Sequence, residues 1–457
     1  MKQQPPEGDL SDQQNTHAIP HSEPAAGTAT IEAALAERES PIKHFLKILG
    51  PGLITGASDD DPSGIGTYTT AGASLGFATL WTALFTFPLM AVVQYLCAKV
   101  GMVSGRGLAG VLKRHYSPWV LYPAVIGLLL ANTINAGADI GAIAAAVNLL
   151  VPIPLVVFII PISLLILALQ IWGSYRLIAR IFRWLTLALF AYIGSVFFTH
   201  PDALAVLKDT FIPTVHWDNA FLSTLVAILG TTISPYLFFW QGNQEVEEEI
   251  SKGRTNLQLR KGATDKELTF AAWDVSLGML LSNLVMYCII LATAATLFKT
   301  GKHDVQSATD AAVALRPLAG NAASILLAVG LIGAGFLAVP VLTGSAAYAL
   351  AEALGWRHGL DKKPAGAKQF YIIIVLATIV GMLLNFIGIN PISALFWTAV
   401  INGVLAPPLL VLLMLVANNP RVMGERVNGR WLNLGGWITT LVMFAAALAL
   451  FLTLGRS

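Results

Sequence analysis

The sequence predicts an all-α polytopic membrane protein with eleven spans. The prediction depends on the composition, on the number of long apolar segments and on two matching interruptions within them. Of the 457 residues, 55% are hydrophobic and 12% are charged, which is about half the charge of an average soluble domain. The net charge of +2 does not suit a nucleic-acid binder. We therefore expect the lipid bilayer, and no nucleic acid, as the surroundings of the chain.

Eleven apolar segments approach or exceed the roughly 20 residues that a helix needs to cross a bilayer. They cover residues 46–70, 76–101, 119–149, 153–173, 177–198, 221–248, 269–298, 322–352, 369–388, 391–417 and 434–454. Residues 1–44 are polar and contain no apolar h-region, so they are predicted to be a disordered tail and not a cleaved signal peptide. Residues 45–457 form the predicted transmembrane domain.

The distribution of Lys and Arg predicts the orientation. If the tail is cytoplasmic, 23 of the 28 Lys and Arg residues fall on the cytoplasmic side. Positive residues concentrate on the cytoplasmic side of membrane proteins. The sequence therefore predicts a multi-pass protein of the plasma (inner) membrane with a cytoplasmic N-terminus.

The first span contains a charged interruption. The aspartates Asp59–Asp61 lie about fifteen residues into the apolar segment and precede Pro62 and Gly64. One carboxylate in the membrane costs at least about 3 kcal/mol, and proline removes an amide donor. The alternative is a span that ends at Ala57 and a solvated loop, but residues 65–80 continue apolar without room for another span. We expect a broken helix whose freed carbonyls a cation can satisfy.

The sixth span has a matching interruption, where Gly230 and Pro235 enclose a polar stretch. A single proline at membrane depth is more often a tolerated kink. Here the breaks fall in the first and sixth spans, which start the two halves of an inverted 5+5 repeat (about 45–198 and 221–417), with 434–454 as an extra helix. Broken helices at equivalent positions of inverted repeats indicate the substrate site of a secondary transporter.

At these residues the chain resembles the NRAMP superfamily of divalent-metal transporters. That family opens its first helix with Gly-Pro-Gly and continues to Asp-Pro-Gly-Asn, where this chain has Gly50-Pro51-Gly52 and Asp61-Pro62-Ser63-Gly64. The family's Ala-x-x-Met-Pro-His of helix six aligns with Thr231 to Tyr236. The resemblance covers spans 1–10. It implies a leucine-transporter-like fold, with helices 1 and 6 broken at the midplane, and divalent-metal transport by alternating access rather than enzyme activity.

Two departures from the family pattern concern the metal ligands. The family's metal-binding Asn aligns with Gly64 and its metal-binding Met with Ser234. Thioether sulfur favours soft metals, whereas oxygen ligands suit Mg²⁺ and Mn²⁺, and Mg²⁺ keeps several waters when bound. We expect a harder, roomier site. The chain is most similar to the NRAMP-related magnesium transporters, and the expected function is Mg²⁺ and Mn²⁺ uptake.

The proton machinery of the family also differs here. The family's helix-six His aligns with Tyr236, and its Asp-x-x-Glu of helix three aligns with Ala136 and Asp139. One carboxylate remains, as a tuner of the site's charge or as a residual proton acceptor. The resemblance to the magnesium branch implies uptake without proton coupling, driven by the gradient and the membrane potential.

The candidate metal site consists of a carboxylate and neutral oxygens. The residues are Asp61, Gly64, Thr231 and Ser234. The alternative role of Asp61 is a purely structural N-cap of the second half-helix. Further residues are candidates for the pathway or vestibule: Asp59, Asp60, Asp139, Tyr236, Gln244 and Glu245. The alternative for Gln244 and Glu245 is a solvated helix end.

Other functions are less well supported by the residues. A proton-coupled Mn²⁺/Fe²⁺ symporter of the NRAMP type is the nearest alternative. An organic-solute symporter of the same fold would hold a substrate carboxylate at the half-helix ends, where three aspartates repel it. A membrane enzyme would need a second acidic or His cluster at membrane depth, and a channel is disfavoured by the inverted repeat. We expect no cofactor besides the transported ion and no obligatory protein partner.

Overall fold

The computed structural model describes residues 50–173 and 190–453, and within them the secondary structure is entirely helical. In this part of the chain eight helical segments are long and apolar enough to cross a membrane. The predicted first span is present as two shorter helices, and the ninth is a 17-residue helix. Most of the predicted fifth span and the whole predicted tail lie outside the described residues.

The first repeat contains a broken helix followed by two long helices and a shorter one. Its elements are α3 (Pro51–Asp59), α4 (Pro62–Leu75), η1 (Gly76–Thr79), α5 (Trp81–Ser104), α6 (Leu108–His115), α7 (Pro118–Leu150), α8 (Leu155–Trp172) and α10 (Ala191–Thr199). The short helix α11 (Ala203–Phe211) connects this repeat to the second.

The second repeat follows the same order. Its elements are α12 (Asn219–Thr232), α13 (Pro235–Ser251), α14 (Leu257–Arg260), α15 (Asp265–Thr296), η3 (Phe298–Thr300), α16 (Ala308–Ala312), η4 (Val313–Leu315), α17 (Arg316–Ala319), η5 (Gly320–Ala322), α18 (Ala323–Leu354), η6 (Pro364–Gly366), α19 (Lys368–Leu384) and α20 (Pro391–Ala417). The chain continues through α21 (Pro420–Met423) and η7 (Gly424–Arg426) to α22 (Arg430–Thr453).

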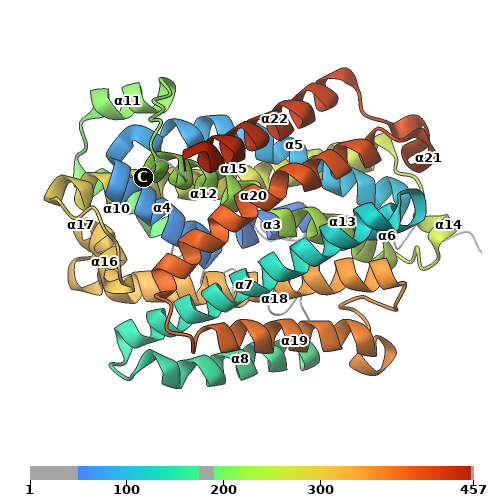
Figure 1. The fold of residues 1–457 in the computed structure, drawn as a ribbon, viewed down its shortest axis with the longest axis horizontal. Helices are drawn as coiled ribbons and strands as arrows, with labels where there is room; N and C mark the ends of the chain where they lie inside the picture. The colour runs from blue at the N-terminus through green and yellow to red at the C-terminus, as the bar shows by residue number, and fades with distance from the viewer. Residues whose placement is uncertain (1–49, 174–189, 454–457) are drawn as a thin grey trace, which may run out of the picture. The chain divides into compact units, whose positions relative to one another are not determined.

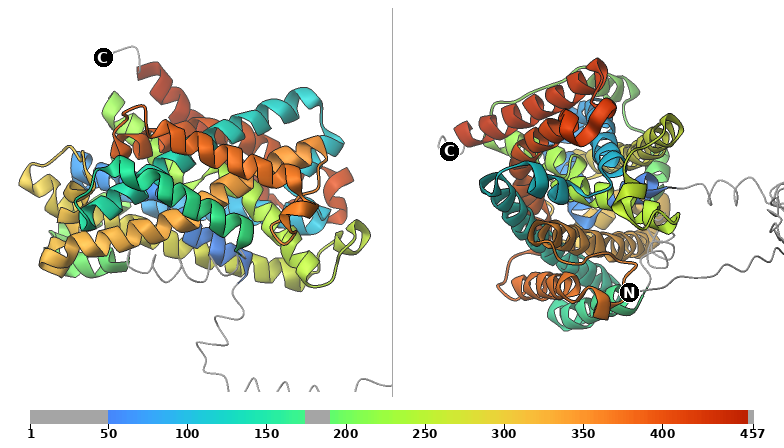
Figure 2. Two further views of the ribbon diagram at one scale, coloured as in Figure 1. Left: turned by 90° about the horizontal axis from the view of Figure 1, so that it is seen from below. Right: turned by 90° about the vertical axis from the view of Figure 1, so that its right-hand side faces the viewer.

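The two repeats interlock through equivalent helices. Both halves of the first broken helix, α3 and α4, pack against α15, and both halves of the second, α12 and α13, pack against α5. The third helices, α7 and α18, run along each other, and the fourth helices, α8 and α19, lie side by side next to them (Figures 1 and 2). This exchange of partners is what an inverted 5+5 repeat with one extra helix, α22, produces.

Close glycine contacts bring the broken helices against their neighbours. A Cβ atom added at Gly56 of α3 would lie 2.4 Å from the backbone of Gly278 in α15. On the other broken helix, a Cβ atom at Gly230 would lie 2.1 Å from the carbonyl oxygen of Ala399 and 2.3 Å from the amide of Gly403 in α20. Small residues permit such backbone approach between membrane helices. They hold both breaks in the interior of the bundle.

Asp274 of α15 fixes the start of the first broken helix. Its carboxylate accepts hydrogen bonds from the amides of Gly50 (3.0 Å) and Gly52 (2.6 Å). The first amides of a helix have no partner within that helix, and a negative charge at this end is favourable. Asp274 therefore has a structural role at the start of α3.

We predict that Gly56→Ala destabilises the protein. The added methyl group must displace the backbone of Gly278, and such overpacking costs about 1–3 kcal/mol. This loss opposes the gain of roughly 1 kcal/mol that Ala usually brings to a helix interior. Thermal unfolding of the purified protein in detergent measures the net effect as a fall in Tm.

Gly366→Ala is the control, because no atom lies within 4 Å of a Cβ added there. A Tm for Gly56→Ala equal to or above that of the unmodified protein would contradict the close packing of α3 on α15.

Candidate functional site

The two helix breaks have the same local construction. In the first, α3 ends at Asp59 and the extended residue Asp61 (φ −71°, ψ 166°) is the N-cap of α4. In the second, α12 ends at Thr232 and the extended residue Ser234 (φ −75°, ψ 126°) is the N-cap of α13. In both breaks a proline occupies the first helical position, where its missing amide leaves no helical hydrogen bond unmade. Asp61 and Ser234 are therefore equivalent residues of the two repeats.

The breaks lie in contact with each other. A Cβ atom added at Gly64 would lie 3.0 Å from Oγ1 of Thr231 and 3.3 Å from the ring of Tyr68. The hydroxyl of Tyr236 donates a hydrogen bond to the carbonyl of Ser58 at 3.0 Å. The predicted residues Asp61, Gly64, Thr231 and Ser234 are all buried. Thr231 occupies part of the space beside Gly64. The site therefore gains less room at this position than the sequence predicts.

Asp61 is the N-cap that the alternative interpretation describes, but its carboxylate has further contacts. Oδ1 accepts hydrogen bonds from the amide of Gly64 (2.7 Å) and the hydroxyl of Ser63 (2.7 Å). Oδ2 accepts a weaker hydrogen bond from Nδ2 of Asn135 at 3.3 Å. Asp61 is only 1% exposed. Its carboxylate is thus oriented by two local hydrogen bonds at the start of α4 and by the side chain of Asn135 in α7.

The other two aspartates of the break face α15. The hydroxyl of Ser282 contacts Oδ2 of Asp59 at 2.7 Å and Oδ1 of Asp60 at 3.1 Å. Both carboxylates are buried, and one hydroxyl proton cannot fully satisfy both of them. The three aspartates therefore diverge, with Asp61 facing α7 and the other two facing α15.

Several buried oxygens at the breaks have no hydrogen-bond partner among the described residues. They are Oδ1 of Asp59, Oδ1 of Asn135, Oγ1 of Thr231 and both carboxylate oxygens of Asp139. Buried polar atoms in native proteins are nearly always paired. Because the carboxylate and amide oxygens among them accept hydrogen bonds, this arrangement favours a bound cation or ordered water.

Asp139 belongs to the site through α7. It lies four residues after Asn135, hence on the same helix face, and is close enough to Asp61 for their charges to interact. Tyr236 lies at the break, where its hydroxyl ties the second half-helix to α3. Of the predicted pathway residues, Asp59, Asp60, Asp139 and Tyr236 are thus brought together with the metal-site candidates.

Gln244 and Glu245 lie apart from the breaks. They are roughly 14 Å further along α13, at 1.5 Å per residue. Glu245 is buried and accepts a hydrogen bond from Nε2 of Gln241 at 2.8 Å, whereas Gln244 is half-buried. Their position on the inner half of α13 is compatible with a lining role and with an ordinary helix end.

The sequence interpretation missed Asn135 and Ser282. Both are polar residues within apolar spans, and Asn135 precedes Asp139 by one helical turn. That spacing is the signal that could have identified Asn135. No comparable signal marks Ser282, because its partners are more than 220 positions away in the chain.

The hydroxyl of Ser234, at the start of α13, bonds back to the end of α12. It donates to the carbonyls of Gly230 (3.0 Å) and Thr231 (2.7 Å). The hydroxyl proton of Ser234 therefore points toward these carbonyls, and the lone pairs of its oxygen remain available to a ligand. No three His, Cys, Asp or Glu side chains of residues 50–173 and 190–453 are grouped to hold a metal ion. A cation at the breaks would therefore depend on neutral oxygens in addition to carboxylate.

The sequence of the chain is similar to that of known transport proteins. Residues 52–453 match the family model described as natural resistance-associated macrophage protein-like (Nramp). The divalent metal cation transporter MntH of Bacillus subtilis is 26% identical over 423 residues, covering 91% of this chain and 94% of the relative. MntH of Klebsiella pneumoniae is 25% identical over 410 residues, covering 88% of this chain and 92% of that relative.

Solved structures show the same fold. The manganese transporter of Eremococcus coleocola, solved with an aromatic bis-isothiourea compound, superposes with a TM-score of 0.72 at 20% identity, covering 91% of this chain and 87% of that chain. Mhp1, a nucleobase-cation-symport-1 family transporter, superposes with a TM-score of 0.52 at 13% identity, covering 88% and 92%. These two structures support the leucine-transporter-like fold, and the family model covers most of the sequence. The chain belongs to the Nramp family of membrane transporters.

Proposed function

We propose that the protein is a secondary transporter that takes up divalent metal cations, with Mg²⁺ and Mn²⁺ as its substrates. The observation that carries this proposal is the set of buried, unpartnered oxygens where the two helix breaks meet. The related proteins named as divalent metal cation transporters and as a manganese transporter support the same substrate class. Alternating access would expose the breaks to one side of the membrane at a time.

In this proposal Asp61 is the charged ligand of the ion. Ser234 is its equivalent in the second repeat, so the two residues face the ion from the two breaks. Oγ1 of Thr231 and carbonyl oxygens near Gly64 and Thr231 supply further neutral ligands. A single directly bound carboxylate leaves room for ion-bound water, which suits a cation that dehydrates reluctantly.

The proposed preference for hard cations depends on the absence of sulfur. Ser234 occupies the position of the family's Met, and its oxygen is a hard ligand. Oxygen ligands and retained water suit Mg²⁺ and Mn²⁺ better than Cd²⁺. The site should therefore discriminate less strongly in favour of soft transition metals than a site containing a thioether.

We further propose that uptake is not coupled to protons. The hydroxyl of Tyr236, at the position of the family's His, is held by the carbonyl of Ser58, and Ala136 replaces one relay carboxylate. The membrane potential supplies about 2.3 kcal/mol per charge per 100 mV, so a divalent ion gains roughly twice this value on entry. With the N-terminus in the cytoplasm and the protein in the plasma membrane, this force is directed inward. Asp139, whose carboxylate has no described partner, is the residue on which a proton-coupled Mn²⁺/Fe²⁺ mechanism would depend.

The first prediction of this proposed function concerns the charge of Asp61. Asp61→Asn keeps an N-cap oxygen for the amide of Gly64 but removes the negative charge. We expect Mg²⁺ uptake into proteoliposomes to fall to the background, together with loss of the metal-binding isotherm.

Asp304→Asn, at an exposed residue, is the matched control and should transport normally. Uptake by Asp61→Asn at the level of the control would reduce Asp61 to a structural cap.

The second prediction concerns ligand softness. Ser234→Met adds a thioether at the second break and should raise Cd²⁺ inhibition of Mg²⁺ uptake, because sulfur prefers the softer ion. Ser234→Ala is the control, since it removes the hydroxyl without adding sulfur. Equal Cd²⁺ competition in both variants, each checked for an intact folded state by its Tm, would refute the argument.

The third prediction concerns proton coupling. Mg²⁺ or Mn²⁺ entering proteoliposomes that contain a pH-sensitive dye should leave the interior pH unchanged, and an inside-negative potential should accelerate uptake. Metal-driven acidification of the interior would instead support the proton-coupled alternative. Loss of that acidification in Asp139→Asn would then identify the proton acceptor.

A further inference from the structure

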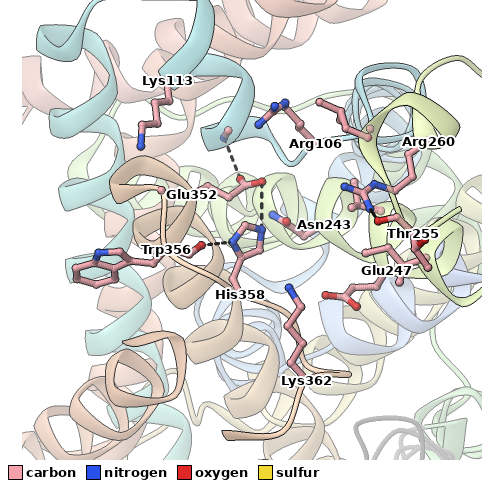
Figure 3. A pocket seen from close by; sticks show the side chains of 16 residues that line it. Arg106, Lys113, Asn243, Glu247, Thr255, Arg260, Glu352, Trp356, His358 and Lys362 are labelled. Carbon is pink, nitrogen blue, oxygen red and sulfur yellow. Dashed lines mark hydrogen bonds and ion pairs between the residues drawn. The ribbon is translucent and has the colours of Figure 1, made fainter. Parts of the chain in front are cut away.

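A cavity with several charged side chains in its lining lies on the side of the bundle that the Lys and Arg bias assigns to the cytoplasm. It measures about 610 Å³ and is enclosed by the ends of α13 and α18, by α6, and by the segments around α14 and η6 (Figure 3). This volume falls within the range of small-molecule sites, roughly 300–1,000 Å³. The residues at the helix breaks do not line it, so the cavity is separate from the proposed metal site.

Four cationic side chains from four different segments line this cavity. Arg106 follows α5, Lys113 lies on α6, Arg260 ends α14, and Lys362 lies between α18 and η6. The ammonium of Lys113 lies over the end of α18, where a Cβ atom added at Gly355 would be 2.6 Å from Nζ. Figure 3 shows these side chains around a common space. Such convergence of like charges is unfavourable unless something neutralises them.

The two carboxylates of the cavity are engaged by other groups. Glu352 accepts hydrogen bonds from the amides of Gly107 (2.8 Å) and Gly110 (3.0 Å), and lies 3.9 Å from Nε2 of His358. Glu247 accepts a hydrogen bond from the hydroxyl of Tyr348 at 2.9 Å. Within residues 50–173 and 190–453, the side chains of Arg106, Lys113 and Lys362 have no ion-pair partner within 4.0 Å. The cavity therefore has a surplus of positive charge.

Arg260 adds an unsatisfied donor. Its Nη1 donates to the carbonyl of Thr255 at 2.7 Å, but its Nε is buried and has no acceptor among the described residues. A buried donor without an acceptor destabilises the folded protein, and more so when it is charged. An acceptor within the cavity would remove this cost.

We propose that this cavity binds a phosphate-bearing anion on the cytoplasmic face. Several cations that approach from different directions suit a group with several charged oxygens, and guanidinium groups bind phosphate in a fork geometry. Trp356 and His358 also line the cavity. A metal cation would be repelled here, so the anion would bind to a site that does not compete with the transported ion.

An anion bound in the cavity would connect segments that otherwise contact one another weakly. It would bridge α6, the α14 segment and the loop before η6, next to the inner ends of α13 and α18. A ligand that binds one conformation better than another stabilises that conformation. The anion would therefore stabilise the conformation in which the inner ends of α13 and α18 lie close together. Transport would then be slower, because the protein would leave this conformation less often.

The test is thermal unfolding of the full-length protein with sodium pyrophosphate. The titration is done in EDTA, so that no metal is present, and at constant ionic strength adjusted with NaCl. We expect a saturable rise in Tm. The double variant Lys113→Gln, Lys362→Gln should raise the apparent Kd about tenfold or more, because it removes two charged donors that would bind the anion.

The matched control is Lys208→Gln with Lys299→Gln, which removes two exposed lysines from the opposite side of the protein. It should bind as the unmodified protein does. Both lysines of the test variant are also exposed, and their removal lessens the repulsion between like charges, so its starting Tm should be no lower than that of the unmodified protein. A rise in Tm that is equal in the test variant and the control would overturn the proposal.

Two further measurements distinguish a soluble anion from a lipid headgroup as the source of the phosphate group. Inorganic phosphate and pyrophosphate in detergent report a soluble anion, whereas nanodiscs of phosphatidylcholine with and without phosphatidylglycerol report a lipid headgroup. Stabilisation by phosphatidylglycerol alone, lost in the test variant, would assign the site to a lipid headgroup. Absence of saturable stabilisation in every arm would overturn the proposal.

Discussion

The structure depends on how peptide groups released from a helix are satisfied inside a membrane. Water is not available there, so each released amide or carbonyl needs a partner within the protein or an ion. Here the two breaks meet each other, and Asp61 and Ser234 begin the second half of each helix. This arrangement leaves oxygens without partners at the centre of the bundle. These oxygens are the reason why we propose a cation site where the two breaks meet.

Such breaks require rigid support from the surrounding helices. Gly56 and Gly278 bring α3 against α15, and Gly230 and Gly403 bring α12 against α20. Asp274 fixes the start of α3 from α15. The first broken helix is therefore held by α15 of the second repeat, whereas the second is held by α20 of its own repeat and by α5 of the first repeat. Alternating access moves one part of such a bundle against the other around a fixed site.

The two signs of charge are separated along the protein. The buried aspartates lie at the breaks and Asp139 lies beside them, whereas Arg106, Lys113, Arg260 and Lys362 line the cavity near the ends of α13 and α18. Glu352 and Glu247 of that cavity are occupied by partners within the fold. The two proposals therefore assign a cation to the centre of the bundle and an anion to the cavity.

The sequence by itself determined the membrane location, the positions of the long helices and the two breaks. These follow from local properties, since apolar length, Asp-Pro and Ser-Pro steps and glycine act within a few residues. The family pattern also identified Asp61, Gly64, Thr231 and Ser234 together. Only the tertiary structure decided that Asn135 contacts Asp61, that Ser282 faces Asp59 and Asp60, and that Thr231 fills space beside Gly64. Those contacts join residues of separate helices, so they depend on helix packing that no local pattern specifies.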